Sequence, residues 1–133
     1  MRLTLKNDFD ELTRLAEALT EFCGRHGVPD ESRITLNVAL EEIVTNIISY
    51  AFDGARERSI DLELGLRDGS LRAIVADDGI AYNPLQHALP DVTLPLEKRR
   101  IGGLGIVLIT RLVDDVTYER TGGRNVLTIS KRV

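Results

Sequence analysis

The sequence predicts a two-layer sandwich of the α/β (α+β) class, in which three helices cover one face of a mostly antiparallel, mixed sheet. Segments in which apolar and polar residues alternate indicate strands, and segments whose apolar residues recur every three or four positions indicate helices. They follow one another as one strand, two helices, two strands, a long irregular stretch, one helix and two strands. This order is typical of one sheet with helices segregated to one face. We expect residues 1–133 to form a single domain, because a chain of this length supports one core.

The first part of the chain is expected to hold one strand and one helix. Residues 2–6 alternate between polar and apolar side chains. Asp8 is a candidate N-cap with Glu11 three positions later, which resembles a capping box, and the glycines and proline at 24–29 end the helix. The apolar residues that share its predicted buried face are Phe9, Leu12, Leu15, Ala16, Leu19, Phe22 and Cys23.

A second helix is predicted from about Asp30 to Phe52. Its main apolar stripe consists of Leu36, Leu40, Ile43, Ile47 and Ala51. A separate and more polar face consists of Thr35, Ala39, Glu42, Asn46, Ser49 and Asp53. Because much of the remaining surface of this helix is apolar, we expect any chemistry to lie on the polar face.

Two antiparallel hairpins are predicted in the second half of the chain. Residues 60–67 alternate in polarity, the Asp68-Gly69 pair predicts a tight turn, and residues 70–77 return as the next strand. Two further strands, at about 115–120 and 125–132, flank a pair of glycines. These segments therefore supply most of the predicted sheet.

A long irregular segment and a third helix lie between the two hairpins. Residues 81–101 have no regular period and contain prolines at 84, 90 and 95. A loop of this length in a compact domain is usually either a functional lid or a disordered segment. The third helix is expected to begin near Leu104 and to carry Ile106, Ile109, Leu112 and Val113 on its apolar side.

The composition excludes several classes of function. The net charge of -4 argues against general binding of nucleic acid. No apolar run approaches the roughly 20 residues that a membrane span needs, and the first residues lack a signal-peptide pattern. The single cysteine, Cys23, cannot form an internal disulfide and is interpreted as a small buried residue. We therefore expect a cytoplasmic protein without direct membrane or nucleic-acid partners.

The first candidate site lies on the polar face of the second helix. Glu42 and Asn46 are four positions apart, so their side chains emerge side by side. An Asn oxygen suits Mg²⁺, which favours oxygen ligands together with substrate phosphates. A Glu within hydrogen-bond reach of a hydroxyl or water accepts its proton. The same spacing is also common on solvated helix faces, so it does not specify a site by itself.

The second candidate is Asp77-Asp78-Gly79, at the end of a predicted strand. A partly buried carboxylate there would accept a hydrogen bond from the amino group of adenine. Guanine presents a carbonyl oxygen at that position, and two facing acceptors in a dry pocket are penalised. An ordinary strand-to-loop turn explains the same residues.

The third candidate is the glycine-rich stretch Gly102-Gly103-Leu104-Gly105, which opens the third helix. Glycines let a backbone approach a ligand closely, and the unpaired N–H groups of a helix start attract anions. Lys98-Arg99-Arg100, just before it, adds local positive charge. A flexible hinge before a helix is the alternative. The P-loop pattern is absent, and Leu108 stands where the last glycine of GxGxxG is required.

Together these stretches resemble a known family. Glu42-Ile-Val-Thr-Asn46, Asp77-Asp78-Gly79-Ile80-Ala81 and Gly103-Leu104-Gly105 resemble the N, G1 and G2 boxes of the GHKL ATPase superfamily, which has the Bergerat fold. More narrowly, the chain is similar to anti-sigma-factor serine/threonine kinases of the RsbW/SpoIIAB type. That narrower similarity covers essentially the whole chain and includes Leu36-Asn37-Val38-Ala39-Leu40, Asn83-Pro84, Leu112-Val113-Asp114 and Gly123-Arg124-Asn125.

The resemblance implies ATP and Mg²⁺ as cofactors and assigns a role to each motif. Asn46 would hold Mg²⁺, Glu42 would be the general base, and Asp77 would contact adenine. Residues 81–101 would form the ATP lid. The nucleotide-contacting set would consist of Asp77, Gly79, Ala81, Lys98, Arg100, Gly103, Leu104 and Gly105. Two residues depart from the family pattern, since Ala81 replaces a usual glycine and Tyr50 stands where a His is frequent.

The resemblance implies a kinase that phosphorylates a serine or threonine of a STAS-domain anti-anti-sigma protein. Such proteins also bind and silence a sigma factor, often as homodimers. A non-catalytic switch, in which ATP orders the lid and changes the affinity for a regulator, is the alternative. The catalytic half of a histidine kinase is disfavoured, because the chain is too short to add a dimerisation hairpin and no His is placed as a phosphoacceptor.

Overall fold

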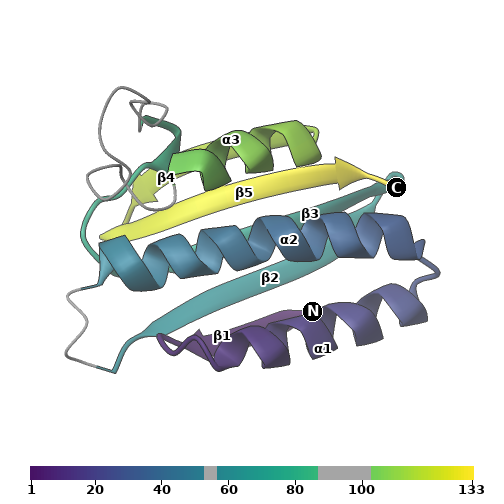
Figure 1. The fold of residues 1–133 in the computed structure, drawn as a ribbon, viewed down its shortest axis with the longest axis horizontal. Coiled ribbons are helices and arrows are strands. Elements are labelled where there is room, and N and C mark those ends of the chain that lie inside the picture. The colour runs from purple at the N-terminus through teal and green to yellow at the C-terminus, as the bar shows by residue number, and fades with distance from the viewer. Residues whose placement is uncertain (53–56, 87–102) are drawn as a thin grey trace.

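The computed structural model describes residues 1–52, 57–86 and 103–133, without the side chains of 86 and 103–106. Figure 1 shows the predicted arrangement, in which the helices lie against one sheet. The helices and strands are β1 (Arg2–Lys6), α1 (Glu11–Arg25), α2 (Asp30–Asn46), β2 (Ser59–Arg67), β3 (Ser70–Asp77), α3 (Gly103–Leu112), β4 (Asp115–Thr121) and β5 (Arg124–Arg132). A π-helical turn (Ile47–Ala51) extends α2, and a 3-10 turn (Pro84–Gln86) follows β3.

The sheet has the strand order β1-β2-β3-β5-β4. All the neighbouring pairs of the described strands are antiparallel, so the predicted two-layer sandwich with a mostly antiparallel sheet is confirmed, without the parallel pair that a mixed sheet would contain. The predicted hairpin turn is present between β2 and β3, where Asp68 and Gly69 have φ of 52° and 76°. Two positive φ values in succession are typical of the type I′ turn that suits the twist of a hairpin.

The core lies between one face of the sheet and the helices. In Figure 1, α2 lies beside α1 and crosses in front of β3. The apolar stripe predicted for α2 is confirmed, since all its members are buried. They pack in one cluster with alternate residues of the strands and with Ile109 and Val113 near the end of α3. Within the described residues, no helix has the length and apolar character needed to cross a membrane.

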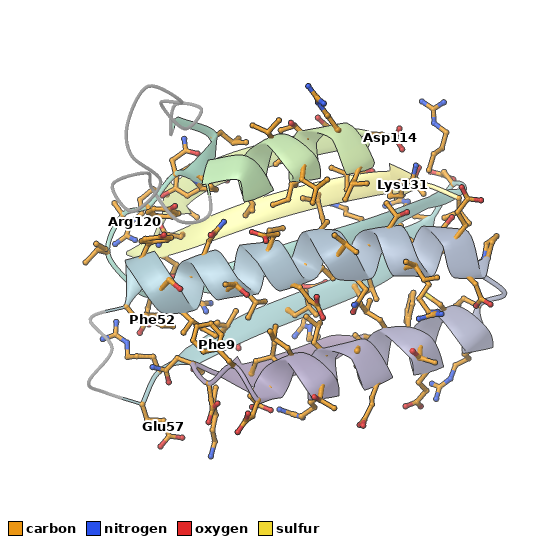
Figure 2. All side chains as sticks on the ribbon, in the orientation of Figure 1. Phe9, Phe52, Glu57, Asp114, Arg120 and Lys131 are labelled. Atoms are coloured by element: carbon orange, nitrogen blue, oxygen red, sulfur yellow. The ribbon has the colours of Figure 1, made fainter. Side chains whose placement is uncertain are left out.

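The start of α1 differs from the prediction. The helix begins at Glu11, so Phe9 precedes it and is 52% exposed. Figure 2 labels the Phe9 side chain. The Asp8 side chain accepts the N–H of Asp10, at 2.9 Å. The Glu11 side chain accepts the N–H of Lys6, at 2.9 Å, instead of closing a capping box with Asp8. Glu11 therefore ties the helix start to the end of β1, which sequence spacing does not reveal.

The end of α2 also differs, because the predicted continuous helix to Phe52 stops at Asn46 and widens into the π turn. The N–H of Phe52 then bonds to the carbonyl of Ile47, at 3.3 Å. Such wide turns are rare and occur frequently at functional sites. Here the turn presents the carbonyl of Ala51, which accepts the N–H of Ile80 at 2.9 Å. The end of the helix is thus joined directly to the loop that follows β3.

Gly79 makes this junction possible, because it lies against the backbone of Ala51. A Cβ atom at residue 79 would be 2.4 Å from the Ala51 carbonyl oxygen and 2.8 Å from its carbon. Both of those atoms are backbone, so they cannot move aside as a flexible side chain would. Gly79 therefore allows close backbone packing between the end of α2 and the loop after β3.

We expect Gly79→Ala to reduce the free energy of unfolding by about 1–3 kcal/mol, because the added methyl group overpacks the junction. Gly65→Ala is the matched control, since a Cβ at residue 65 of β2 meets nothing within 4 Å. Urea unfolding of both variants measures the difference. Equal stability of the two variants would contradict the proposed close packing.

Candidate functional site

Asp77 is a buried carboxylate at the end of β3, and its side chain is only 1% exposed. Its Oδ1 atom accepts the N–H of Gly79 at 2.8 Å and an Nδ2 hydrogen of Asn125 at 3.0 Å. Among the described residues nothing donates to its Oδ2 atom. One oxygen is therefore fixed by the protein, and the other is left to accept a hydrogen bond from a ligand.

Burial raises the pKa of the Asp77 carboxyl group above its ordinary value. The hydrogen bonds from Asn125 and Gly79, and the charge of Arg120, oppose this shift without cancelling it. A carboxylate that is largely withdrawn from water is costly for a folded protein. Such a group is typical of a binding site.

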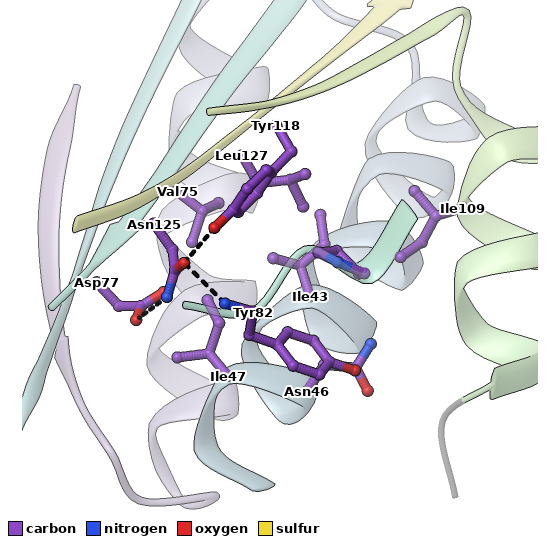
Figure 3. Close-up of a pocket in the computed structure, with 11 residues that line it drawn as sticks. Ile43, Asn46, Ile47, Val75, Asp77, Tyr82, Ile109, Tyr118, Asn125 and Leu127 are labelled. Atoms are coloured by element: carbon purple, nitrogen blue, oxygen red, sulfur yellow. Dashed lines mark hydrogen bonds between the residues drawn. The ribbon is translucent and has the colours of Figure 1, made fainter. Parts of the chain in front are cut away.

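Asn125 is the residue that orients Asp77, and it faces Asp77 across the β3–β5 pair. Its amide donates to Asp77 and to the carbonyl of Ile80, at 2.8 Å. Its Oδ1 atom accepts the hydroxyl of Tyr118 at 2.5 Å and the N–H of Tyr82 at 3.0 Å. Figure 3 shows this network at one end of the pocket. All four bonding positions of the amide are used, so its orientation is fixed.

Sequence patterns assign no role to Asn125, although it lies in the Gly123-Arg124-Asn125 stretch that resembles the family. The only local signal of a special role is that an Asn stands in a predicted strand with apolar residues, because Asn is depleted in strands. Apart from Tyr118, the partners of Asn125 are distant in the sequence, and Asp77 lies 48 positions away. The register that brings Asn125 opposite Asp77 cannot be read from either segment alone.

Two arginines hold the outer side of the loop after β3. Arg120 donates to the carbonyl of Gly79 at 2.8 Å, and Arg58 donates to the carbonyl of Asp78 at 2.9 Å. Arg58 also pairs with the carboxylate of Asp78, at 3.3 Å, and lies 5.2 Å from the centre of the Phe52 ring. Figure 2 shows Phe52 and Arg120 at the same end of the molecule. The loop at 77–82 is thus anchored from several directions.

One narrow pocket contains residues from two of the predicted motifs. Asp77 and Asn46 both line it, and Figure 3 shows its interior. The cavity measures about 20 Å³, which is room for about one water molecule. Its lining residues are Ile43, Asn46, Ile47, Val75, Asp77, Tyr82, Pro84, Ile109, Tyr118, Asn125 and Leu127. An apolar wall with a few convergent polar groups is the usual composition of a ligand site.

Asn46 and Glu42 occupy the same side of α2, as their spacing predicts. Asn46 is the last residue of α2 and is 5% exposed, whereas Glu42 is half-buried. Within the described part of the chain, neither side chain has a hydrogen-bond partner. No group of three or more His, Cys, Asp or Glu residues in that part could hold a metal by itself. The arrangement suits a cation held by one protein oxygen and by phosphates of a ligand.

The remaining predicted residues are placed only in part. Ala81 is exposed in the loop after β3. Lys98, Arg100 and most of the predicted lid lie outside the described residues. Gly103 is the first residue of α3, with Leu104 and Gly105 in its first turn, and the side chain of Leu104 lies outside the described part. Further along α3, Ile109 lines the pocket, so this helix reaches the same site.

Comparison with known families and proteins identifies relatives along nearly the whole chain. The sequence profile of the histidine kinase-like ATPase domain matches residues 5–131. The serine-protein kinase RsbW of Listeria monocytogenes is 33% identical over 87% of this chain and 75% of its own length. The serine/threonine-protein kinase BtrW of Bordetella bronchiseptica is 32% identical over 74% of this chain and 69% of its own length. The predicted resemblance to kinases of the RsbW type is confirmed. The names of these relatives also agree with the predicted enzyme class, a serine/threonine protein kinase.

Solved structures support the fold. The RsbU and RsbW domains of a Mycobacterium tuberculosis protein match 99% of this chain with a TM-score of 0.65 and 19% identity, over 32% of that longer chain. The histidine kinase domain of a blue-light-activated kinase from Erythrobacter litoralis matches 93% of this chain with a TM-score of 0.55 and 20% identity, over 60% of its own length. The predicted fold class is thereby confirmed.

The raised pKa of Asp77 predicts how Asp77→Asn changes stability with pH. The folded protein favours the protonated carboxyl, so the wild type loses stability as the pH rises through this raised pKa, above 3.8. An Asn keeps an oxygen for both described donors but does not titrate. The stability of Asp77→Asn relative to the wild type should therefore increase as the pH rises and then level off.

Asp61→Asn provides the contrast of opposite sign. The hydrogen bond from Arg124, at 2.6 Å, lowers the pKa of Asp61, so its ionised form stabilises the folded protein. Relative to the wild type, Asp61→Asn should lose stability as the pH rises through the carboxyl range. Urea unfolding at a series of pH values measures both trends. A stability difference between Asp77→Asn and the wild type that does not change with pH would contradict the raised pKa of Asp77.

Proposed function

Because this chain belongs to the histidine kinase-like ATPase domain family, we propose that it is an ATP-dependent serine/threonine protein kinase. Its proposed substrate is a STAS-domain anti-anti-sigma protein, and it is proposed to sequester a sigma factor. The names of the relatives from Listeria and Bordetella support the kinase activity. The family resemblance supports the partners. A cytoplasmic location and a homodimer are parts of the same proposal.

The observation that carries the proposal is the shared pocket of Asp77 and Asn46. The free Oδ2 atom of Asp77 is suited to accept the amino group of adenine, since the pocket around it is otherwise mostly apolar. Because Oδ1 already receives two hydrogen bonds, the orientation of the carboxylate is fixed, and in the ionised form Oδ2 acts only as an acceptor. This arrangement favours adenine over a base with a carbonyl oxygen at the same position.

The opposite end of the site is suited to phosphates. Asn46 would contribute one oxygen to Mg²⁺, and the backbone of the first turn of α3, at Gly103 and Gly105, would face the phosphates. When bound, the metal would neutralise charge on the phosphates. The chain's own residues then hold the nucleotide between the buried end of β3 and the start of α3. That placement accounts for all three sequence motifs in one site.

Glu42 is the proposed general base for the serine hydroxyl. It lies one turn before Asn46 on the same helix, and it is half-buried without a described partner. A carboxylate that is not already hydrogen-bonded can accept the hydroxyl proton as the oxygen attacks. The same freedom also favours the alternative function, a non-catalytic ATP-dependent switch, because no described residue orients Glu42.

We expect Glu42→Gln to reduce phosphate transfer to the STAS protein by at least about a hundredfold, since it removes the general base. The dissociation constant for ATP should stay within about twofold, because Glu42 does not line the adenine pocket. The measurement is transfer of labelled γ-phosphate to STAS-domain proteins of the same organism, together with calorimetric titration of ATP.

The matched control is Glu41→Gln, at the neighbouring position of α2. Glu41 accepts a long hydrogen bond from Asn37, at 3.4 Å, and has no part in the proposed chemistry. This variant should transfer phosphate at the wild-type rate. Phosphate transfer by Glu42→Gln at the wild-type rate would exclude Glu42 as the base. ATP binding by the wild type without any phosphoprotein product would favour the non-catalytic switch.

A further inference from the structure

Arg120 stands in line with the two residues on which the site depends. In the register of the sheet it faces Asn125 across the β4–β5 pair, and Asn125 faces Asp77 across the β3–β5 pair. Tyr118, two positions earlier on β4, lines the pocket, as Figure 3 shows. Alternate residues of a strand point to the same face of a sheet, so the Arg120 side chain leaves β4 on the pocket side. One row of three strands thus carries an arginine, an amide and a carboxylate.

The guanidinium of Arg120 binds a peptide group of the loop after β3. It donates to the carbonyl of Gly79, at 2.8 Å. The N–H of the same peptide group belongs to Ile80 and donates to the carbonyl of Ala51, at 2.9 Å. This peptide group is therefore held at one end by β4 and at the other by the π turn that ends α2.

Gly79 transmits the position of this peptide group to Asp77. The N–H of Gly79 donates to Oδ1 of Asp77 at 2.8 Å, and Asn125 donates to the same oxygen at 3.0 Å. A displacement of the Gly79 carbonyl would also displace its N–H and weaken the bond to the carboxylate. The direction in which Oδ2 of Asp77 points therefore depends on Asn125 directly and on Arg120 through Gly79.

Arg120 also acts on Asp77 through its charge. Among the described residues, Arg120 and Asp78 are the charged groups that act on this carboxyl group, and Arg120 favours the ionised form whereas Asp78 disfavours it. The titratable side chains that line the pocket beside Asp77 are those of Tyr82 and Tyr118. The residues opposite Asp77 on β2 and β5, and the residue of α2 across the pocket, are uncharged, and they are Ile60, Asn125 and Asn46.

We propose that Arg120 is a positioning residue for nucleotide recognition, which fixes the loop after β3 so that Oδ2 of Asp77 faces the amino group of adenine. The inference rests on the proposed function, since the ligand is the base of ATP. Arg120 does not line the pocket, so its effect passes through Gly79 and through its charge. Its removal should therefore change how well Asp77 distinguishes adenine from a base with a carbonyl oxygen at the same position.

The test compares Arg120→Gln, which removes the charge, with Arg120→Lys, which keeps it. Calorimetric titration measures the affinities for ATP and for inosine triphosphate, each with Mg²⁺, at a series of pH values. The preference for ATP should fall as the pH is lowered through the pKa of Asp77, because a protonated carboxyl group donates to the carbonyl oxygen of inosine. Arg120→Gln should bind ATP roughly 2- to 10-fold more weakly and lose the preference at a higher pH than the wild type.

Arg72→Gln is the matched control, because it changes the net charge equally at an exposed position of β3 that alternates with buried residues. Arg120 is exposed as well, so its replacement should leave the protein folded. Arg72→Gln and Arg120→Lys should lose the preference for ATP at the same pH as the wild type. If the midpoint of Arg120→Gln also equals that of the wild type, with ATP affinity equal or weaker, the positioning role is overturned and the proposed function stands.

A second measurement needs no nucleotide. The carboxyl carbon of Asp77 is followed by NMR in ¹³C-labelled protein as the pH is varied, and its resonance is identified by its loss in Asp77→Asn. The titration midpoint should lie at a higher pH in Arg120→Gln than in the wild type, because the opposing charge is removed. An unmoved midpoint in folded Arg120→Gln would contradict the proposal. If the wild type binds no ATP at any pH, the proposed function fails, and the recognition role of Arg120 fails with it.

Discussion

The structure of the site depends on the hydrogen-bonded pair formed by Asn125 and Asp77 across β5 and β3. Asn125 fixes one oxygen of the buried carboxylate and also binds the loop that leaves β3 at Ile80 and Tyr82. The pair is expensive, because burial raises the pKa of Asp77 and leaves its second oxygen without a described donor. Replacing both partners of such a pair with apolar side chains of similar shape is often neutral or stabilising for a fold. We therefore interpret the pair as a feature retained for recognition.

The helices and strands of the fold position irregular backbone segments next to this pair. The sandwich places a regular, aliphatic core between the sheet and the helices, and members of this core such as Ile43, Val75 and Leu127 also form the apolar wall of the pocket. Departures from regular structure are concentrated at element ends, where α2 widens into a π turn and Gly79 contacts Ala51. Asn46 and Asp77 are themselves the last residues of their elements. Rigid elements thus hold a site whose chemistry is carried by their ends.

Local patterns predicted most of the fold and the positions of the motifs. The alternation in β2 and β3, the Asp68-Gly69 turn and the stripe of α2 depend on neighbouring residues, so a single sequence is enough to detect them. The role of Asn125, the link between Glu11 and Lys6, and the π turn depend on contacts that only the folded chain creates. The prediction that Phe9 lies on the buried face of the first helix was wrong for the same reason. The contact between Glu11 and Lys6 sets the start of the helix after Phe9. The nucleotide-contacting roles of Lys98 and Arg100 stay predictions from the sequence, because both residues lie outside the described part of the chain.

The central claim is that Asp77 uses its free oxygen to select the amino group of adenine. The most direct test is calorimetric titration of the wild type with ATP and with inosine triphosphate, each with Mg²⁺, at a pH at which Asp77 is ionised. Inosine carries a carbonyl oxygen where adenine carries the amino group. The loss of a hydrogen bond to a charged group predicts binding that is weaker by roughly 10- to 150-fold. Equal affinities for the two nucleotides would contradict the account.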